Sequence, residues 1–567
     1  MLQRSGLRFI AAVCAGLVST AVQAQAPSPP VSPTIPTPSE LADRRPEVAT
    51  DPSKLPAPLR APPRQLGRPD EEVKVDITRY AVNAEAPESL KLALGQLTGG
   101  FTGKGKTFAD MSDAAAEVTR FLQRDLGYYL GFAYIPEQEP ADGVIRIEVL
   151  EGRLDQIELK WRDGLPVDRA IVDAYLAQLQ PGDVLRVRDV ERVVFLINDL
   201  RGLSAEFEVK AGRTPGTASL VVTPRALPLT TWQAELDNAN ARSLGQWRVN
   251  GSVYRNSPFG RGDSASASLI ASEGLAFGLA NYTIPVGGNG LRLGASVSAL
   301  KYKVDQQAVP LGVRGQASTI TAFGLYPIIR SRNLNLFAVA SLDAKAYEDD
   351  VGGIVTKKDV ANTNLGLTGD LRDSLLGGGI NSLDMQLTTG RISFNDDPAS
   401  DPPDSRFTKL SGRFVRLQNL VPGVLQAYLG GKLQKAWNNL DVTEQFRAGG
   451  PDGVRAFPAG EGSGDNGALV SLELRAIAPA EWLSAIGGQA VFSLFVDRAV
   501  VQLRNDQTDP TVTDNKLSFA GWGIGLNWDG PDGWDLRATL ARPTINEPRD
   551  ESDRPSARFY MQLGKQF

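Results

Sequence analysis

The chain has 567 residues, a length at which several folded units are expected rather than one. It contains no histidine, which excludes Ser-His-Asp triads, Cys-His pairs and histidine metal sites, and its formal net charge of −5 argues against nucleic acid as the main partner. We therefore expect no enzyme, no cofactor and no metal site.

Residues 1–26 have the pattern of a secretory signal peptide. Arg4 and Arg8 precede an apolar run, and small residues suited to cleavage follow near Ala24 or Ala26. The run is too short to cross a membrane as a helix. The only cysteine, Cys14, lies within it, so the mature chain would contain no thiol or disulfide, as suits an oxidising periplasm.

Residues 27–70 are predicted to form an extended, semi-rigid linker. This segment holds 13 of the 37 prolines, and a sequence of that composition cannot build a core. Only residues 39–45 could make a helical turn or two before Pro46.

Residues 71–153 predict a first small α+β domain. Val73, Val75 and Ile77 alternate with charged residues as in a half-buried strand. An amphipathic helix is expected over 112–129, and a second over 87–97. Strands over 132–135 and 144–150 complete this unit.

Residues 154–225 repeat the pattern and predict a second α+β domain. A strand at 157–161 precedes helices over 167–179 and 187–200, and strands at 205–210 and 219–223 follow. Units of about 75 residues lie within the range of small domains.

From residue 226 to residue 567 the sequence predicts an all-β transmembrane barrel. Trp522, Ile524, Leu526 and Trp528 alternate with small or polar residues, which is typical of a barrel strand. The mature chain offers no apolar stretch long enough for a transmembrane helix, so only a closed barrel could satisfy the backbone in lipid. About 340 residues support roughly 14–18 strands with their turns and loops.

The last strand carries a candidate targeting signal. Phe559, Met561 and Leu563 alternate with polar or small residues, and the chain ends on Phe567. A terminal aromatic residue on such a strand resembles the recognition signal of bacterial outer-membrane barrels.

One loop motif is the main candidate site. Val454, Arg455, Ala456 and Phe457 follow a glycine pair in a long predicted loop, and about forty residues later Phe495 and Asp497 end an apolar strand. We expect Arg455 to reach into the lumen and pair with Asp497, since an arginine–carboxylate pair can fix orientation as well as proximity. The alternative is two ordinary charges in a polar lumen.

Together these features resemble the outer-membrane transporters of two-partner secretion, the family that secretes and activates haemolysins and filamentous adhesins. The family pattern has glycine where this chain has Ala456 and Ala499. Further stretches that carry the resemblance are 131–138 and 151–153 in the first domain, 196–202 in the second, and 237–263 and 326–331 in the barrel.

The resemblance implies two polypeptide-transport-associated (POTRA) domains in the periplasm and a barrel of sixteen strands in the bacterial outer membrane. It implies that the POTRA domains bind a large secreted exoprotein of the adhesin or cytolysin type, which leaves through the barrel. The other expected partners are outer-membrane lipid and the barrel assembly machinery, and the protein is expected to be monomeric. The alternatives are an insertase that assembles other barrels and a passive porin.

Three further motifs match functional patterns by their letters alone. Residues 100–107 satisfy the phosphate-binding loop pattern, but the preceding segment predicts a helix rather than a buried strand, so we expect a glycine-rich connection. Arg261-Gly262-Asp263 looks like a cell-adhesion tripeptide, yet its place between two barrel segments predicts a turn. Residues 462–467 match a dinucleotide fingerprint without a following helix, so a flexible loop is expected.

Overall fold

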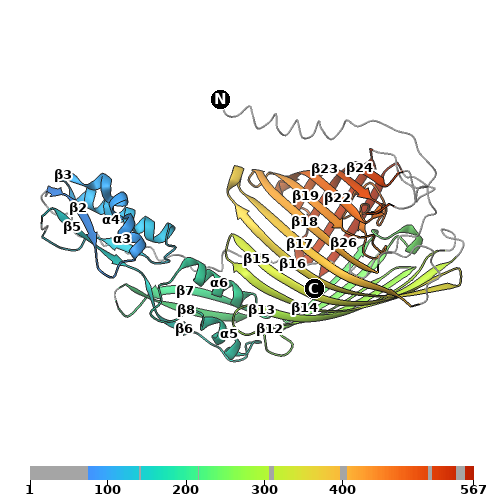
Figure 1. Ribbon diagram of the computed structural model, residues 1–567, viewed down its shortest axis with the longest axis horizontal. Helices are drawn as coiled ribbons and strands as arrows, with labels where there is room; N and C mark the ends of the chain where they lie inside the picture. The colour runs from blue at the N-terminus through green and yellow to red at the C-terminus, as the bar shows by residue number, and fades with distance from the viewer. Residues whose placement is uncertain are drawn as a thin grey trace.

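The computed structural model describes residues 74–139, 142–214, 216–305, 312–395, 405–507, 514–544 and 556–567. Two small α+β domains precede a closed barrel of sixteen strands (Figure 1). This confirms the predicted fold class and strand number. The signal sequence and the linker predicted before residue 71 lie outside the described residues. None of the helices in the described ranges is long and apolar enough to cross a membrane.

The first domain packs two helices against a three-stranded sheet. Leu90, Val118 and Ile147, which come from the two helices and the central strand, are fully buried in one core. The strand order is β2-β5-β4, and β1 pairs separately with β3. The elements are β1 (Val75–Ile77), β2 (Arg79–Val82), α3 (Glu88–Thr98), β3 (Gly103–Lys106), α4 (Phe108–Arg124), β4 (Phe132–Tyr134) and β5 (Val144–Leu150).

Helix α4 begins four residues earlier than predicted and ends five residues earlier. The reason is a capping box, in which Thr107 and Asp110 satisfy each other's backbone N–H groups at the helix start. The residues before Thr107 form strand β3, which pairs with β1, and helix α3 precedes them. The strand–loop–helix context of a phosphate-binding loop is therefore absent here, and Thr107 serves as a helix cap.

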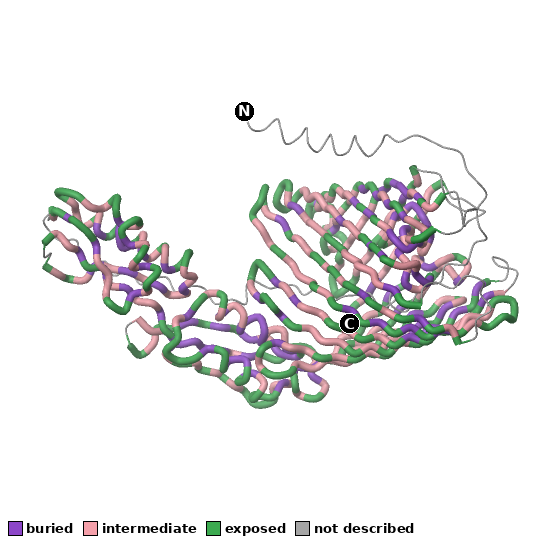
Figure 2. The backbone as a smooth tube through the Cα atoms, in the orientation of Figure 1, coloured by how far each residue is buried: buried purple, intermediate pink, exposed green. Residues whose placement is uncertain are grey.

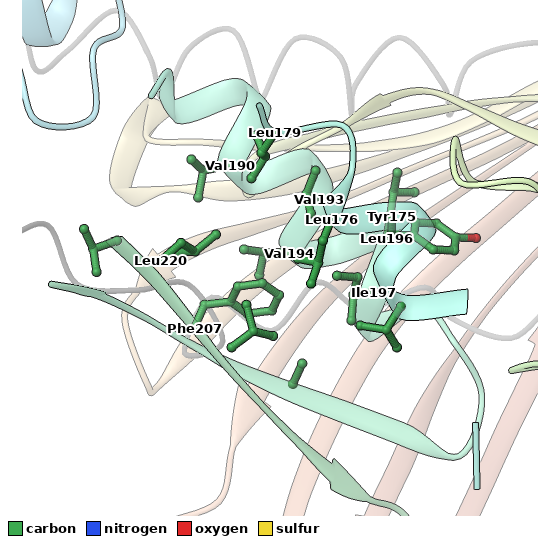
Figure 3. Close-up of a cluster of buried hydrophobic side chains, with 14 of the residues drawn as sticks. Tyr175, Leu176, Leu179, Val190, Val193, Val194, Leu196, Ile197, Phe207 and Leu220 are labelled. Atoms are coloured by element: carbon green, nitrogen blue, oxygen red, sulfur yellow. The ribbon is translucent and has the colours of Figure 1, made fainter. Parts of the chain in front are cut away.

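The second domain packs α5 and α6 on one face of a three-stranded sheet of order β6-β8-β7. Figure 3 shows its core, where Val194 lies beside Phe207 of the sheet and Tyr175 belongs to the same buried cluster. Both helices are shorter than predicted, and both lie within the predicted ranges. The elements are β6 (Arg153–Leu159), α5 (Arg169–Leu176), α6 (Val187–Asn198), β7 (Leu203–Ala211) and β8 (Thr217–Ala226).

The barrel strands are antiparallel neighbours, and exposed and buried residues alternate along them (Figure 2). Apolar residues such as Leu365 and Leu387 face outward, whereas Asn364 and Thr388 beside them are buried in the lumen. The strands are β9 (Thr230–Asp237), β10 (Arg248–Asn256), β11 (Ser264–Ala271), β12 (Leu275–Val286), β13 (Leu291–Lys303), β14 (Val313–Arg330), β15 (Leu334–Val351), β16 (Ile354–Asp373), β17 (Gly379–Phe394), β18 (Arg406–Val421), β19 (Leu425–Ala436), β22 (Asn466–Ile477), β23 (Gln489–Gln502), β24 (Lys516–Asp529), β25 (Trp534–Pro543) and β26 (Arg558–Gln566).

The barrel closes between its first and last strands. Five residue pairs join β26 to β9, fewer than join any other two neighbouring barrel strands. The Asn238 side chain extends this seam, since its Oδ1 accepts from the Met561 N–H at 2.7 Å and its Nδ2 donates to the Phe559 carbonyl at 3.1 Å. The Phe567 N–H donates to the Trp232 carbonyl at 2.9 Å.

The second domain is fixed to the barrel by a buried ion pair. Arg330, at the end of β14, donates from Nε and Nη2 to the two carboxylate oxygens of Asp199 at 3.0 and 2.7 Å. Its guanidinium also lies over the Phe195 ring, 5.1 Å from the centroid, and Arg330 is only 4% exposed. Arg192 of α6 donates to the Pro327 carbonyl at 3.0 Å. These contacts place the domain against the short turns at one end of the barrel.

The Arg261-Gly262-Asp263 tripeptide belongs to the same contact and forms the predicted turn, between β10 and β11. Gly262 has a φ of +67°, and its carbonyl accepts from the Arg201 N–H at 3.1 Å. Asp263 is 1% exposed and accepts from the Tyr282 hydroxyl at 2.8 Å. A buried aspartate in a domain contact does not present an adhesion motif.

Candidate functional site

The loop over residues 437–465 connects β19 to β22 and folds back into the barrel. Its short strands β20 (Phe446–Arg447) and β21 (Ser463–Gly464) pair with each other. Val454 and Phe457 of the loop are buried together with Phe495 and Phe519 of the wall in one apolar cluster. The loop is therefore packed against the inner face of β22 to β25.

Arg455 lies at the tip of this loop and pairs with Asp497. Its Nε and Nη2 donate to the two oxygens of Asp497 at 2.9 and 2.7 Å, and its backbone N–H donates to the same carboxylate at 3.1 Å. Its Nη1 donates to Glu473 Oε1 at 2.7 Å, and Nη2 also donates to Ser471 Oγ at 2.9 Å. The guanidinium carbon stands 3.4 Å from the centroid of the Phe495 ring.

The register of two strands explains why four partners converge on one arginine. Ser471 lies opposite Asp497, and Glu473 lies opposite Phe495, so the four side chains form a square on the lumen face of β22 and β23. Asp497 is fully buried, and the Arg455 side chain is 11% exposed. Separating the two side chains would leave a buried charge without its partner, which costs free energy. The pair is therefore expected to keep its geometry.

The pairing of Arg455 with Asp497 was predicted from the sequence, whereas the contacts of Arg455 with Ser471 and Glu473 were not. A signal was present, because Ser471, Glu473 and Arg475 alternate with apolar residues in β22, as lumen-facing residues do. Arg475 in turn donates to Glu473 Oε2 at 2.7 Å and lies over the Tyr428 ring.

The other three residues of the predicted motif hold the loop tip by packing. The Val454 N–H donates to the Ala448 carbonyl at 2.7 Å within the loop. Phe457 meets Phe519 edge to face at 5.1 Å, and its carbonyl accepts from the Tyr560 hydroxyl at 2.8 Å. Ala456 faces Gly521 of β24, where an added Cβ would come within 2.5 Å of the Ala456 Cβ. The missing side chain of Gly521 makes room for the alanine in the loop.

The base of the loop is held by a second set of ion pairs that the sequence did not reveal. Glu444 accepts from Lys345 of β15 at 2.7 Å and from Lys409 of β18 at 2.8 Å. Asp441 accepts from Lys358 of β16 at 2.9 Å. Burial alone would raise the pKa of Glu444, but the two lysines outweigh burial and lower it to about 2.

The predicted C-terminal signal residues lie on the closing strand. Tyr560 points into the lumen, where it contacts Phe457, so Phe559, Met561 and Leu563 face outward. Phe559 is 48% exposed and Phe567 is 69% exposed. Across the described ranges no group of three histidine, cysteine or carboxylate residues could hold a metal ion.

Two family models match the chain. Residues 216–528 match the model described as "Haemolysin secretion/activation protein ShlB/FhaC/HecB", and residues 76–152 match "POTRA domain, ShlB-type". The chain belongs to the haemolysin secretion/activation protein family. It is a two-partner secretion transporter of the outer membrane, with POTRA domains on the periplasmic side.

Similar proteins share this architecture at low sequence identity. The transporter is 23% identical over 507 residues to the heme/hemopexin transporter protein HuxB of Haemophilus influenzae, with 88% of each chain covered. It is 24% identical over 445 residues to the outer membrane transporter CdiB of Dickeya dadantii, with 76% of each covered. The structure of CdiB from Escherichia coli superposes with a TM-score of 0.70 at 19% identity, covering 91% of this chain and 94% of that one.

Proposed function

We propose that the two POTRA domains capture one large exoprotein, of the adhesin or cytolysin type, and that the barrel conducts it outward. The family membership supports an exported partner. The strand order supports capture in extended form, because β4 lies at one edge of the first sheet and β7 at one edge of the second. An extended segment can add to such an edge through main-chain hydrogen bonds.

In this proposal the loop tip acts as a fixed support within the lumen. Arg455 orders the tip through Asp497, Glu473 and Ser471, while Val454, Ala456 and Phe457 pack it onto the wall. The observation that carries the proposal is the burial of Arg455 among four wall side chains, each on a strand that must hold its register for the square to form.

Several further assignments belong to the same proposal. The chain has no enzymatic activity, works as a monomer in outer-membrane lipid, and reaches the membrane through the barrel assembly machinery. That machinery would recognise Phe559, Met561, Leu563 and Phe567. The segments are a signal peptide at 1–26, a linker at 27–70, POTRA domains at 71–153 and 154–225, and the barrel at 226–567.

The test of the proposed capture is deletion of residues 72–224, with secretion of the exoprotein and channel conductance measured side by side. Export should be abolished while a channel remains, because the soluble capture domains are gone. Continued export of the partner would place recognition elsewhere in the chain.

A second experiment identifies the partner. The full-length transporter is cross-linked in cells through a photoreactive residue at Tyr134, on the edge strand β4, and the attached chains are identified by mass spectrometry. One large exoprotein attached through its N-terminal region supports the proposal. A spread of outer-membrane barrel proteins would instead favour an insertase, and no attached chain at all would favour a passive porin.

A further inference from the structure

The outer surface of β17 and β18 changes from polar to apolar and back to polar. Residues that lie directly opposite each other on these strands share a face, and Ile392 and Phe407 between them are buried in the lumen. From the extracellular to the periplasmic end, the outward pairs are Arg391–Arg406, Thr389–Thr408, Leu387–Leu410, Met385–Gly412, Leu383–Phe414 and Asn381–Arg416.

These pairs mark the two boundaries of the membrane. The lipid-facing apolar band of an outer-membrane barrel is about 25 Å tall. Three apolar pairs, from Leu387 to Phe414, lie in the middle of this band. The outermost pairs are ten residues apart along β17, which is about 34 Å along the strand and about 24–28 Å in height for a strand tilted by about 35–45°. Arg391 and Arg406 therefore lie at the level of the outer-leaflet headgroups, and Arg416 lies at the inner-leaflet level.

The arginine at the inner boundary has its charge neutralised by protein. Arg416 Nη1 donates to Asp373 Oδ2 at 2.7 Å and to Asn381 Oδ1 at 2.7 Å. Its Nη2 donates to Asp373 Oδ1 at 3.1 Å, and its Nε donates to Gln418 Oε1 at 3.1 Å. This site needs no anion from outside the chain.

Among the described residues, the two arginines at the outer boundary have no such counter-ion. Arg391 and Arg406 are both exposed, and neither forms an ion pair with any residue that the structure describes. Asp359 on the neighbouring strand β16 accepts from Asn395 Nδ2 at 2.9 Å. Like charges directly opposite each other on a sheet destabilise it, so this pair would gain from a bound anion.

The same two arginines border a hollow of about 400 Å³. Thr389, Thr408 and Asn438 add polar groups to its lining, and Ala361, opposite Arg391 on β16, leaves space with its small side chain. Beside the hollow lies Trp437, which is 51% exposed. The backbone N–H of Trp437 donates to the Thr408 carbonyl at 3.0 Å. Aromatic residues at this level are typical of the interface between barrel and headgroups.

We propose that Arg391 and Arg406 bind a phosphate group of a phosphorylated glycolipid in the outer leaflet. Guanidinium groups match phosphate with paired N–H donors, and two of them face one hollow. A bound phosphate removes the repulsion between the arginines, and the lipid's acyl chains then lie along the apolar pairs below. The site lies apart from the loop tip at Arg455 and from the POTRA domains, although Asn438, at the start of the same loop, belongs to its lining.

The test compares glycolipid binding by the folded full-length protein and two variants in detergent, using native mass spectrometry. The probes are bisphosphorylated lipid A, the same lipid A without its phosphates, and inorganic pyrophosphate as a competitor. The first variant carries Arg391→Gln together with Arg406→Gln. The matched control is Arg314→Gln, which removes an outward arginine at the extracellular end of β14 that Asp350 already neutralises at 2.7 Å.

The double variant should lose about tenfold or more in affinity for phosphorylated lipid A, which corresponds to about 1.4 kcal/mol. The control should bind like the wild type, and dephosphorylated lipid A should bind weakly to all three. Heat-modifiable gel mobility confirms that each barrel is folded. Equal binding of both lipids, or an equal loss in the control, overturns the proposal. Full displacement by pyrophosphate would assign a site for free anions and overturn the lipid assignment.

Discussion

Ala456 at the loop tip packs onto Gly521 of β24, the residue that lies opposite Asp497 on the neighbouring strand. The methyl group of the loop and the missing side chain of the wall are complementary in shape. Gly521→Ala should therefore destabilise the docked loop by about 1–3 kcal/mol through overpacking. Thermal unfolding of the purified barrel measures this loss.

The second half of this prediction is a rescue. Adding Ala456→Gly to Gly521→Ala should restore most of the lost stability, because one methyl group is removed where the other was added. Gly251→Ala is the matched control, since a Cβ at Gly251 meets nothing within 4 Å. A double variant no more stable than Gly521→Ala alone would contradict the packing described here.

Arg455→Ala should reduce secretion of the exoprotein while the barrel remains inserted in the membrane. The reason is that the loop tip loses its contacts to Asp497, Glu473 and Ser471 together. Secretion into the medium and heat-modifiable mobility are the two measurements. Arg413→Ala is the control, because Arg413 faces the lumen from β18 and makes no ion pair with the described residues. Secretion at the wild-type level from Arg455→Ala would rule out a role for the tip.

The Arg455–Asp497 pair should show coupling in a double-mutant cycle. Removing one partner of a shielded pair typically costs about 3–5 kcal/mol, and the lumen water reduces that figure. Asp497→Asn in an Arg455→Ala background should therefore cost much less than Asp497→Asn alone. Urea unfolding of the four proteins gives the coupling free energy, and strictly additive losses would show that the two side chains act separately.

The ion pairs that hold the base of the loop to the barrel should break in acid. The folded pKa of Glu444, about 2, is below its unfolded value of about 4.3, so its ion pairs stabilise the fold fully above that value. This contribution is lost as the pH falls from about 4.3 toward 2. Conductance in planar bilayers should be steady at neutral pH and rise over that window. Glu444→Gln should show raised conductance already at pH 7, with a smaller acid step; an unchanged profile would argue against a clamp at Glu444.

Arg330→Ala should loosen the second POTRA domain from the barrel. The variant leaves Asp199 partly buried without its bidentate partner, and the cation–π contact with Phe195 is also lost. Distances between spin labels on the domain and on the barrel should broaden in the variant. Arg332→Ala is the control, since its contact to Glu191 is longer, at 3.8 Å, and more exposed. Equally narrow distributions in Arg330→Ala would show that other contacts fix the domain.

Much of the fold could be predicted because it depends on local patterns. The alternation around Trp522 to Trp528 identifies a barrel strand by itself, and the helical periodicity around Val193 identifies α6. The predicted start of α4 was wrong. Thr107 also ends the glycine-rich motif over residues 100–107, but its spacing to Asp110 is that of a capping box, which marks the start of a helix.

The candidate site was predicted only in part, for a physical reason. Arg455 stands out as a charge between two apolar residues, and Asp497 stands out as a carboxylate at the end of an apolar run. Lys345, Lys358 and Lys409 resemble any other lysine on a barrel strand, and their carboxylate partners lie at least 35 residues away in the chain. Contacts of that kind are set by the closure of the barrel, which no local pattern encodes.

The base and the tip of the loop over residues 437–465 are bound to different strands of the barrel and by different kinds of contact. The base depends on single lysine contacts from β15, β16 and β18, whereas the tip depends on a bidentate arginine that is also stacked on a ring and packed among apolar residues. Lysine holds a carboxylate as a mobile point charge, and arginine holds it with a rigid fork. If the pore widens, the lysine contacts at the base should break before the contacts of Arg455. The loop would then rotate about Arg455, and the ion pairs of Glu444 would control whether it can do so.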